Sequence, residues 1–208
     1  MESNWAAEHL QVIRTLMERS ALYRRALAPV MIFNGVLGVA GGAVGWACGI
    51  SSGPAFVAYW EGVAISALAG SFLLVRRQAL KDAEPFWSPP TRRVGQALLP
   101  PLLIGAAAGV LECLHPRPEL VAVLPAFWML LYGCALNAAG FFMPRGIKLL
   151  GWIFIVCGCG WMGVCATCTA ERAWSPTAGH ALMGGVFGGL HLAHGIYLYF
   201  TEPRGNEP

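Results

Sequence analysis

The sequence has little charge for its length. Asp, Glu, Lys and Arg make up 12% of its 208 residues, whereas hydrophobic residues make up 56%. A soluble domain carries about 25% charged residues, so this composition excludes an ordinary soluble domain and indicates an integral membrane protein. The formal net charge of +3 is too small to indicate a nucleic-acid partner. The partner that the composition predicts is the lipid bilayer.

Catalytic sequence motifs are lacking as well. The chain contains no Gly-rich phosphate loop, no G-x-S-x-G, no H-E-x-x-H and no pair of carboxylates spaced for acid and base catalysis. A membrane enzyme can work without these motifs, but the sequence then names no reaction. We therefore expect a protein without catalysis of its own.

The chain has long apolar runs instead. Each of six runs holds about 20 residues or more, enough to cross about 30 Å of hydrocarbon as a helix. No cleavage site follows the first run convincingly, so we expect all six in the mature protein. The predicted spans are residues 27–48, 55–75, 94–114, 120–142, 147–169 and 178–200. The predicted fold class is all-α, an integral membrane bundle of six transmembrane helices within residues 27–200.

The Lys and Arg residues are divided unevenly between the loops. Twelve of the 14 lie in the N-terminal segment, the second and fourth loops and the C-terminal tail, and only Arg117 and Arg172 lie in the other loops. Basic loops stay on the cytoplasmic side of the membrane. The sequence therefore predicts that both termini are cytoplasmic and that residues 201–208 form a cytoplasmic tail.

Residues 1–26 carry a helical apolar stripe. Ala6, Leu10, Ile13 and Met17 follow one another at steps of three or four residues, and the charged side chains fall off this stripe. This pattern predicts an amphipathic helix that lies at the cytoplasmic interface of the membrane. A short soluble helix packed against the bundle fits the same pattern.

Glycines recur at four-residue spacing in three of the predicted spans. They are Gly41, Gly45 and Gly49, then Gly105 and Gly109, and then the pairs Gly184 with Gly188 and Gly185 with Gly189. Small residues at this spacing let membrane helices approach closely. We expect a compact bundle without a wide pore. The same faces offer contact to a second copy of the chain or to another membrane protein.

The stretch "VCGCGWMGVCATC", residues 156–168, holds four of the seven cysteines. On a helix Cys157 and Cys159 point in nearly opposite directions, and Cys157 lies about 12 Å from Cys165 along the axis. One ion cannot reach all four sulfur atoms, because a metal–sulfur bond is about 2.3 Å long. Only Cys165 and Cys168, at positions i and i+3, are close enough to act together.

The predicted topology brings further cysteines to the outer side of the membrane. Cys48 and Cys113 end the first and third spans there, as Cys165 and Cys168 end the fifth. The acidic and histidine residues expected near this boundary are Glu61, Glu112, His115, Glu119, Glu171 and His180. The candidate metal ligands are therefore Cys48, Cys113, His115, Cys165, Cys168 and His180. Simple packing, a disulfide, and a zinc or copper site all fit this arrangement.

The last span carries three histidines on one face, His180, His191 and His194. Two haems held across a membrane would need matching histidines on a second helix, and only His9 and His115 remain, so we predict no haem and no other cofactor. A buried histidine needs a polar partner or a wet cavity. Asn34 and Asn137 are expected at the same depth as His191 and His194. These four residues form a predicted intramembrane cluster, either as hydrogen bonds between helices or as a proton or ligand site.

Both ends of the chain carry recognisable motifs. "IRTLMERSALY" leads into "NGVLGVAGGAVGW", and "GGVFGGLHLAHGIYLYF" forms the last span. They resemble an uncharacterised family of small six-helix bacterial inner-membrane proteins, with an I-R-x-x-M-E-R-S start and a G-x-L-H-x-x-x-G-I-x-Y last helix. Arg14, Glu18, His191 and Gly195 match these motifs. The resemblance implies a multi-pass location in the bacterial cytoplasmic membrane and implies no activity.

Two hypotheses about function follow. The first is a multi-pass membrane protein that acts as scaffold, sensor or accessory subunit without its own catalysis. The second is a carrier of a small molecule or metal, or a redox protein, that uses the outer Cys/His/Glu residues or the inner His/Asn cluster. The absence of catalytic motifs favours the first, and the polar residues inside predicted spans motivate the second.

Overall fold

The structure is a computed structural model that describes residues 26–83, 85–143, 145–167 and 175–201. These residues are helical and contain no strand, which confirms the all-α prediction. They include six helices that are long and apolar enough to cross a membrane, as expected for a multi-pass protein. The predicted amphipathic helix of residues 1–26 and the predicted tail lie outside the described residues, apart from Ala26 and Thr201.

The described helices follow the predicted spans closely. They are a first helix (Ala26–Ala47), α2 (Gly53–Lys81), α3 (Pro89–Leu114), α4 (Pro118–Ala139), α5 (Arg145–Thr167) and a last helix in three parts, α7 (Pro176–Met183), η1 (Gly184–Gly189) and α8 (Leu190–Thr201). The largest difference is in α2, which continues about a turn and a half beyond its apolar run to Lys81. Arg76 and Arg77 therefore lie on a helix and not in a loop.

Proline and serine define where these helices begin. Proline stands in the first turn of α2, α3, α4 and α7, where its missing N–H is not needed for a helical hydrogen bond. Ser52 and Ser175 cap α2 and α7, because each side-chain oxygen accepts a hydrogen bond from the N–H three residues later, at 3.3 Å and 3.1 Å. The short loops thus end in residues that favour a helix start.

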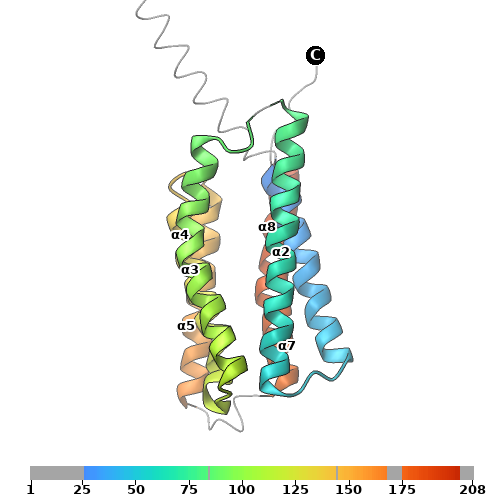
Figure 1. Ribbon diagram of the computed structural model, residues 1–208, viewed down its shortest axis with the longest axis vertical. Coiled ribbons are helices and arrows are strands. Elements are labelled where there is room, and N and C mark those ends of the chain that lie inside the picture. The colour runs from blue at the N-terminus through green and yellow to red at the C-terminus, as the bar shows by residue number, and fades with distance from the viewer. Residues whose placement is uncertain (1–25, 84, 144, 168–174, 202–208) are drawn as a thin grey trace, which may run out of the picture.

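The helices stand in two groups of three (Figure 1). One group contains α3, α4 and α5, and α4 packs extensively against both of its neighbours. The other group contains the first helix, α2 and the last helix. The chain therefore enters one group, crosses to the other for three consecutive helices, and returns for its last helix.

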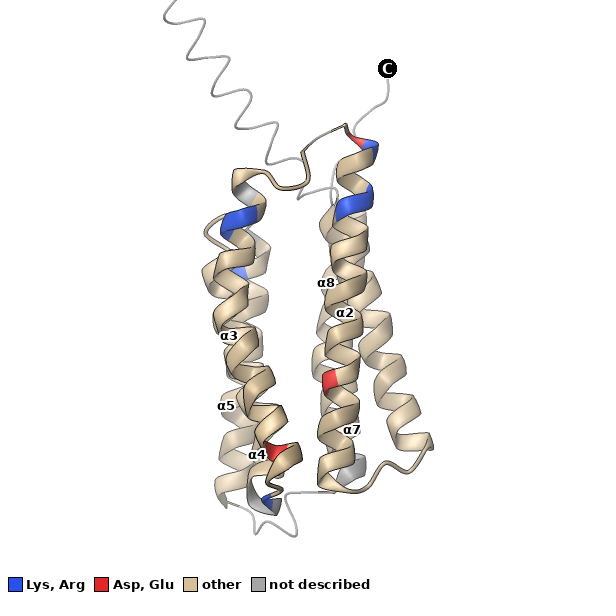
Figure 2. Cartoon of the chain, viewed as in Figure 1, with Lys and Arg blue, Asp and Glu red and all other residues tan. Residues whose placement is uncertain are grey.

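The charged residues of the described helices lie mainly at one end of the bundle (Figure 2). We call this the basic end; the last turns of α2 and the first turns of α3 and α5 carry its basic residues, Arg76, Arg77, Lys81, Arg92, Arg93 and Lys148. The first helix begins and the last helix ends there. The opposite end holds the ion pair of Arg117 with the buried Glu112, whose nearest N and O atoms lie 2.6 Å apart.

Glycine brings the first and last helices into backbone contact. A Cβ atom at Gly38 would lie 2.7 Å from Cα of Gly188, and one at Gly42 would lie 2.9 Å from Cα of Gly184. Both distances are shorter than a van der Waals contact, so only glycine fits. The predicted pair Gly184 and Gly188 thus packs inside the bundle, against Gly42 and Gly38 of the first helix.

Two apolar clusters join the helix groups near the two ends of the bundle. Near the basic end, Met31 of the first helix packs with Leu136 and Ile147 of the other group. Near the opposite end, Phe56 of α2 packs with Val121 of α4. Side chains of the second cluster, Trp60 and Met183 among them, also line a cavity in the bundle.

Candidate functional site

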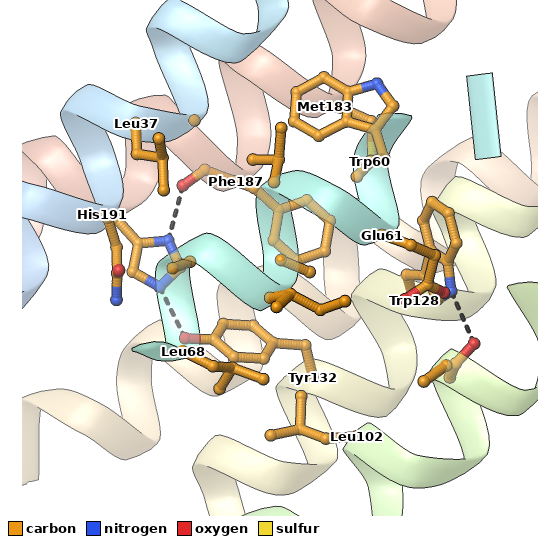
Figure 3. A pocket seen from close by; sticks show the side chains of 18 of the residues that line it. Leu37, Trp60, Glu61, Leu68, Leu102, Trp128, Tyr132, Met183, Phe187 and His191 are labelled. Atoms are coloured by element: carbon orange, nitrogen blue, oxygen red, sulfur yellow. Dashed lines mark hydrogen bonds between the residues drawn. The ribbon is translucent and has the colours of Figure 1, made fainter. Parts of the chain in front are cut away.

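A cavity of about 230 Å³ lies between the two helix groups. Its lining comes from the first helix, α2, α3, α4 and the last helix, and most of the lining side chains are apolar (Figure 3). Ile65 and Leu68 of α2 line it and are 64% and 51% exposed, so the cavity is open beside α2. Pockets for small ligands have this general form, an apolar concave wall with a few polar groups.

Glu61 is the only acidic residue among the described side chains that line the cavity. It is the ninth residue of α2, about 12 Å along the helix from Gly53, and its side chain is partly buried. Its carboxyl group contacts Gly109 of α3, where any side chain would collide with it. No described residue donates a hydrogen bond to this carboxyl group. An acidic group at membrane depth is unfavourable unless it serves a ligand or a partner.

His191 of α8 lines the cavity with both ring nitrogens in hydrogen bonds. Nδ1 lies 2.6 Å from the carbonyl oxygen of Phe187, and Nε2 lies 2.6 Å from the hydroxyl oxygen of Tyr132. A carbonyl oxygen only accepts, so Nδ1 carries the hydrogen and donates it. In the neutral ring Nε2 then accepts from the Tyr132 hydroxyl group. Figure 3 shows both bonds at one side of the cavity.

The segment before His191 is a π-helix, η1, which is a rare form often found at functional sites. It carries Phe187, whose ring packs against those of Tyr132 and Phe154 at centroid distances of 5.7 Å and 5.0 Å. Gly184 and Gly188 of η1 lie against the first helix, whereas a Cβ atom at Gly185 or Gly189 would meet no described atom within 4 Å. The π-helical turns of η1 thus place Phe187 at the cavity, while Gly184 and Gly188 keep the first helix close to the last helix.

The predicted inner cluster is divided by the structure. Asn34 and His191 both line the cavity, and the Asn34 side-chain oxygen accepts a hydrogen bond of 3.1 Å from Ser71. Asn137 instead donates to the carbonyl oxygen of Gly133 in its own helix and lies against α5. His194 lies over Gly146, and its Nε2 is buried without a hydrogen-bond partner among the described residues.

The candidate outer ligands that the structure describes contact different groups and not one another. Cys113 points its thiol at the carbonyl oxygen of Pro54, at 3.7 Å, and Cys165 points its thiol at that of Ala122, at 3.6 Å. Cys48 is an exposed free thiol, and His115 is exposed at the end of α3. Cys168 lies outside the described residues. Within the described part of the chain, no three His, Cys, Asp or Glu side chains are placed to hold a metal ion.

His180 is a buried structural residue in this arrangement. Its Nδ1 accepts a hydrogen bond of 3.2 Å from the indole N–H of Trp60, and its Nε2 donates to the carbonyl oxygen of Ile50 over 3.1 Å. The ring lies directly on Gly45 and 5.0 Å from the Phe56 ring centroid. His180 therefore joins the last helix to α2 and to the loop after the first helix, and neither nitrogen has a free lone pair for a metal.

The sequence predicts Glu61 near the outer boundary and singles out neither Tyr132 nor Trp128. The position of Glu61 within an apolar run was a sequence signal for an intramembrane carboxyl group. Tyr132 and Trp128 carry no such signal, because their role depends on which helices meet. Trp128 donates its indole N–H to the carbonyl oxygen of Gly105 over 3.0 Å and so forms part of the cavity wall.

The described residues form an all-helical protein with six helices of membrane-spanning length, five of which line a mainly apolar cavity. Comparisons of the chain with protein-family models, with curated proteins and with solved structures found no match.

Proposed function

We propose that this protein is a multi-pass protein of the bacterial cytoplasmic membrane that binds a small, mainly apolar molecule in the central cavity. It has no catalysis of its own and acts as a sensor, accessory subunit or carrier. The basic end faces the cytoplasm in this proposal, with both termini on that side, as the positive-inside rule requires.

One observation carries the proposal. The bundle is packed closely enough for glycine backbones to touch, yet about 230 Å³ remains open in its middle. Interiors of proteins are normally filled to the density of organic crystals, so a concave space of this size, open beside α2 and holding a polar group, suits a bound molecule. A pure scaffold needs no such cavity, and the candidate outer ligands that the structure describes have no arrangement that favours a metal carrier.

A binding assay with a matched pair of variants tests the proposal. Ala106 lines the cavity from α3, whereas the next residue, Ala107, is exposed and does not line it. The neutral compound tert-butylbenzene should raise the Tm of the purified wild type and of Ala107→Phe, measured by tryptophan fluorescence in one non-ionic detergent. Ala106→Phe fills the cavity and should abolish the rise.

Equal rises in all three proteins would place the compound in the detergent or on the outer surface, and the proposal would be wrong. The same conclusion would follow if neither this compound nor a cation of the same shape raised the Tm of the wild type. The Tm values without ligand show whether each variant has folded, and Ala107→Phe controls for the added ring.

A further inference from the structure

We infer that the ligand of the cavity is a small organic cation, a hydrophobic amine or quaternary ammonium ion, whose positive charge pairs with Glu61. This inference rests on the proposed function, because it names the chemical class of the molecule that occupies the same cavity. It assigns Glu61 as the binding residue that selects the charge of the ligand.

The charge of the lining supports a cation. Among the described residues that line the cavity, Glu61 is the only acidic one, and none is Lys or Arg. The carboxyl group receives no hydrogen bond from the residues that the structure describes, and its close contact, Gly109, offers only backbone. A carboxylate in this setting has lost part of its hydration and has gained no counter-charge. A bound ammonium group would supply that charge.

The other polar groups at the cavity leave this charge uncompensated. His191 is buried, and among the described residues its ring nitrogens bond only to Phe187 and Tyr132, so burial without a counter-charge favours the neutral ring. Asn34 is engaged with Ser71. An anionic ligand would meet Glu61 without any cationic side chain, and a neutral ligand would leave the carboxyl group unpaired.

Aromatic rings provide the second feature that suits an organic cation. Trp128, Tyr132 and Phe187 all line the cavity, and Figure 3 shows Glu61 beside Trp128 with the other two rings toward His191. The Trp128 N–H and the Tyr132 hydroxyl group are already bonded to Gly105 and His191. The Trp128 ring beside Glu61 can still offer its face, and aromatic faces attract ammonium groups. The Tyr132 and Phe187 rings, which pack on one another, can contact the apolar part of the same ligand.

The size of the cavity limits the ligand. A volume of about 230 Å³ is below the range of about 300–1,000 Å³ that is typical of sites for drug-sized molecules. A cation with a single ring fits this limit. The cavity is open beside α2, at Ile65 and Leu68, so an amphipathic cation can enter from the side.

Two ligands of the same shape test the inference. Phenyltrimethylammonium carries a permanent charge, and tert-butylbenzene is its neutral counterpart. The apparent Kd of each ligand is measured for wild type, Glu61→Gln and Glu61→Asp in one non-ionic detergent. Comparing each ligand with itself between proteins removes the effect of partition into micelles.

We expect Glu61→Gln to weaken binding of the cation about tenfold or more, as is typical for loss of a charged partner, and to leave the neutral ligand unchanged. Glu61→Asp keeps the charge and should retain most of the preference for the cation. A Kd of the cation that is equal in wild type and Glu61→Gln overturns the inference, as does an equal loss for both ligands.

The proposed function has a separate outcome. If both ligands bind to Glu61→Gln as they bind to wild type, and Ala106→Phe abolishes binding of both, the cavity is a ligand site and only its charge preference is refuted. If neither ligand binds wild type, the proposed function is refuted together with the inference.

Discussion

The hydroxyl oxygen of Tyr132 lies 2.6 Å from Nε2 of His191, and this hydrogen bond joins α4 to α8. It therefore connects the two groups of helices at the wall of the cavity. Tyr132→Phe should lower the free energy of unfolding by about 1–3 kcal/mol, because it leaves a buried ring nitrogen without a donor. Unfolding of the purified protein by a denaturing detergent measures this change.

Tyr197→Phe is the matched control for that variant. Tyr197 lies on the same helix as His191, but its side chain is 60% exposed. We expect no measurable change in stability from it. If Tyr132→Phe were as stable as Tyr197→Phe, the hydrogen bond to His191 would not contribute to the packing of the two groups.

Neighbouring glycines of η1 should respond differently to one added methyl group. A Cβ atom at Gly188 would overlap the backbone of Gly38 and Val39, whereas one at Gly189 would meet no described atom within 4 Å. Gly188→Ala should therefore destabilise the protein by about 1–3 kcal/mol, as overpacking does, and Gly189→Ala should not. Thermal unfolding of both variants measures the difference, and equal Tm values would contradict the observed contact between the first and last helices.

The contact of Trp60 with His180 predicts a further stability effect. Trp60→Phe keeps a ring at this position but removes the N–H that His180 Nδ1 accepts, so stability should fall by about 1–3 kcal/mol. Trp152→Phe is the control, because Trp152 is 59% exposed on α5.

Added zinc tests whether His180 is a metal ligand instead. A metal ligand would make zinc raise the stability of the wild type and not of His180→Ala. We expect that zinc changes the stability of neither protein.

Labelling of Cys48 tests the proposed orientation. Cys48 is exposed at the end opposite to the basic end, which carries Lys81. In intact bacterial cells that produce a variant with Cys48 as its only cysteine, a membrane-impermeant maleimide should label the protein. A variant whose only cysteine is Lys81→Cys should be labelled only after the cells are permeabilised. The reverse pattern would place the basic end outside and contradict the positive-inside assignment.

The helices and the cavity differ in how far the sequence predicts them. Apolar runs give the spans, because each run must satisfy its own backbone in the absence of water. The apolar run underestimates the length of α2, because the last turns of this helix are polar and continue to Lys81. The glycine rows predict close packing, but they do not say that Gly38 would meet Gly188, because a row of small residues carries no information about its partner.

The candidate site was predicted only in part for the same reason. Asn34 and His191 both line the cavity, whereas Asn137 donates to the carbonyl oxygen of Gly133 in its own helix and lies against α5. His180 has the right chemistry for a ligand, yet Trp60 and Ile50 occupy both of its nitrogens. Such competition between neighbours is decided by helix packing and not by spacing along the chain.

The most direct test of the central claim is the position of a bound ligand. Crystals of the wild type grown with 4-bromophenyltrimethylammonium would show bromine by its anomalous scattering. We predict a bromine peak within the cavity between α2, α3 and α4, and no such peak in Ala106→Phe. A bromine peak only on the outer surface of the bundle, or an empty cavity, would contradict the account.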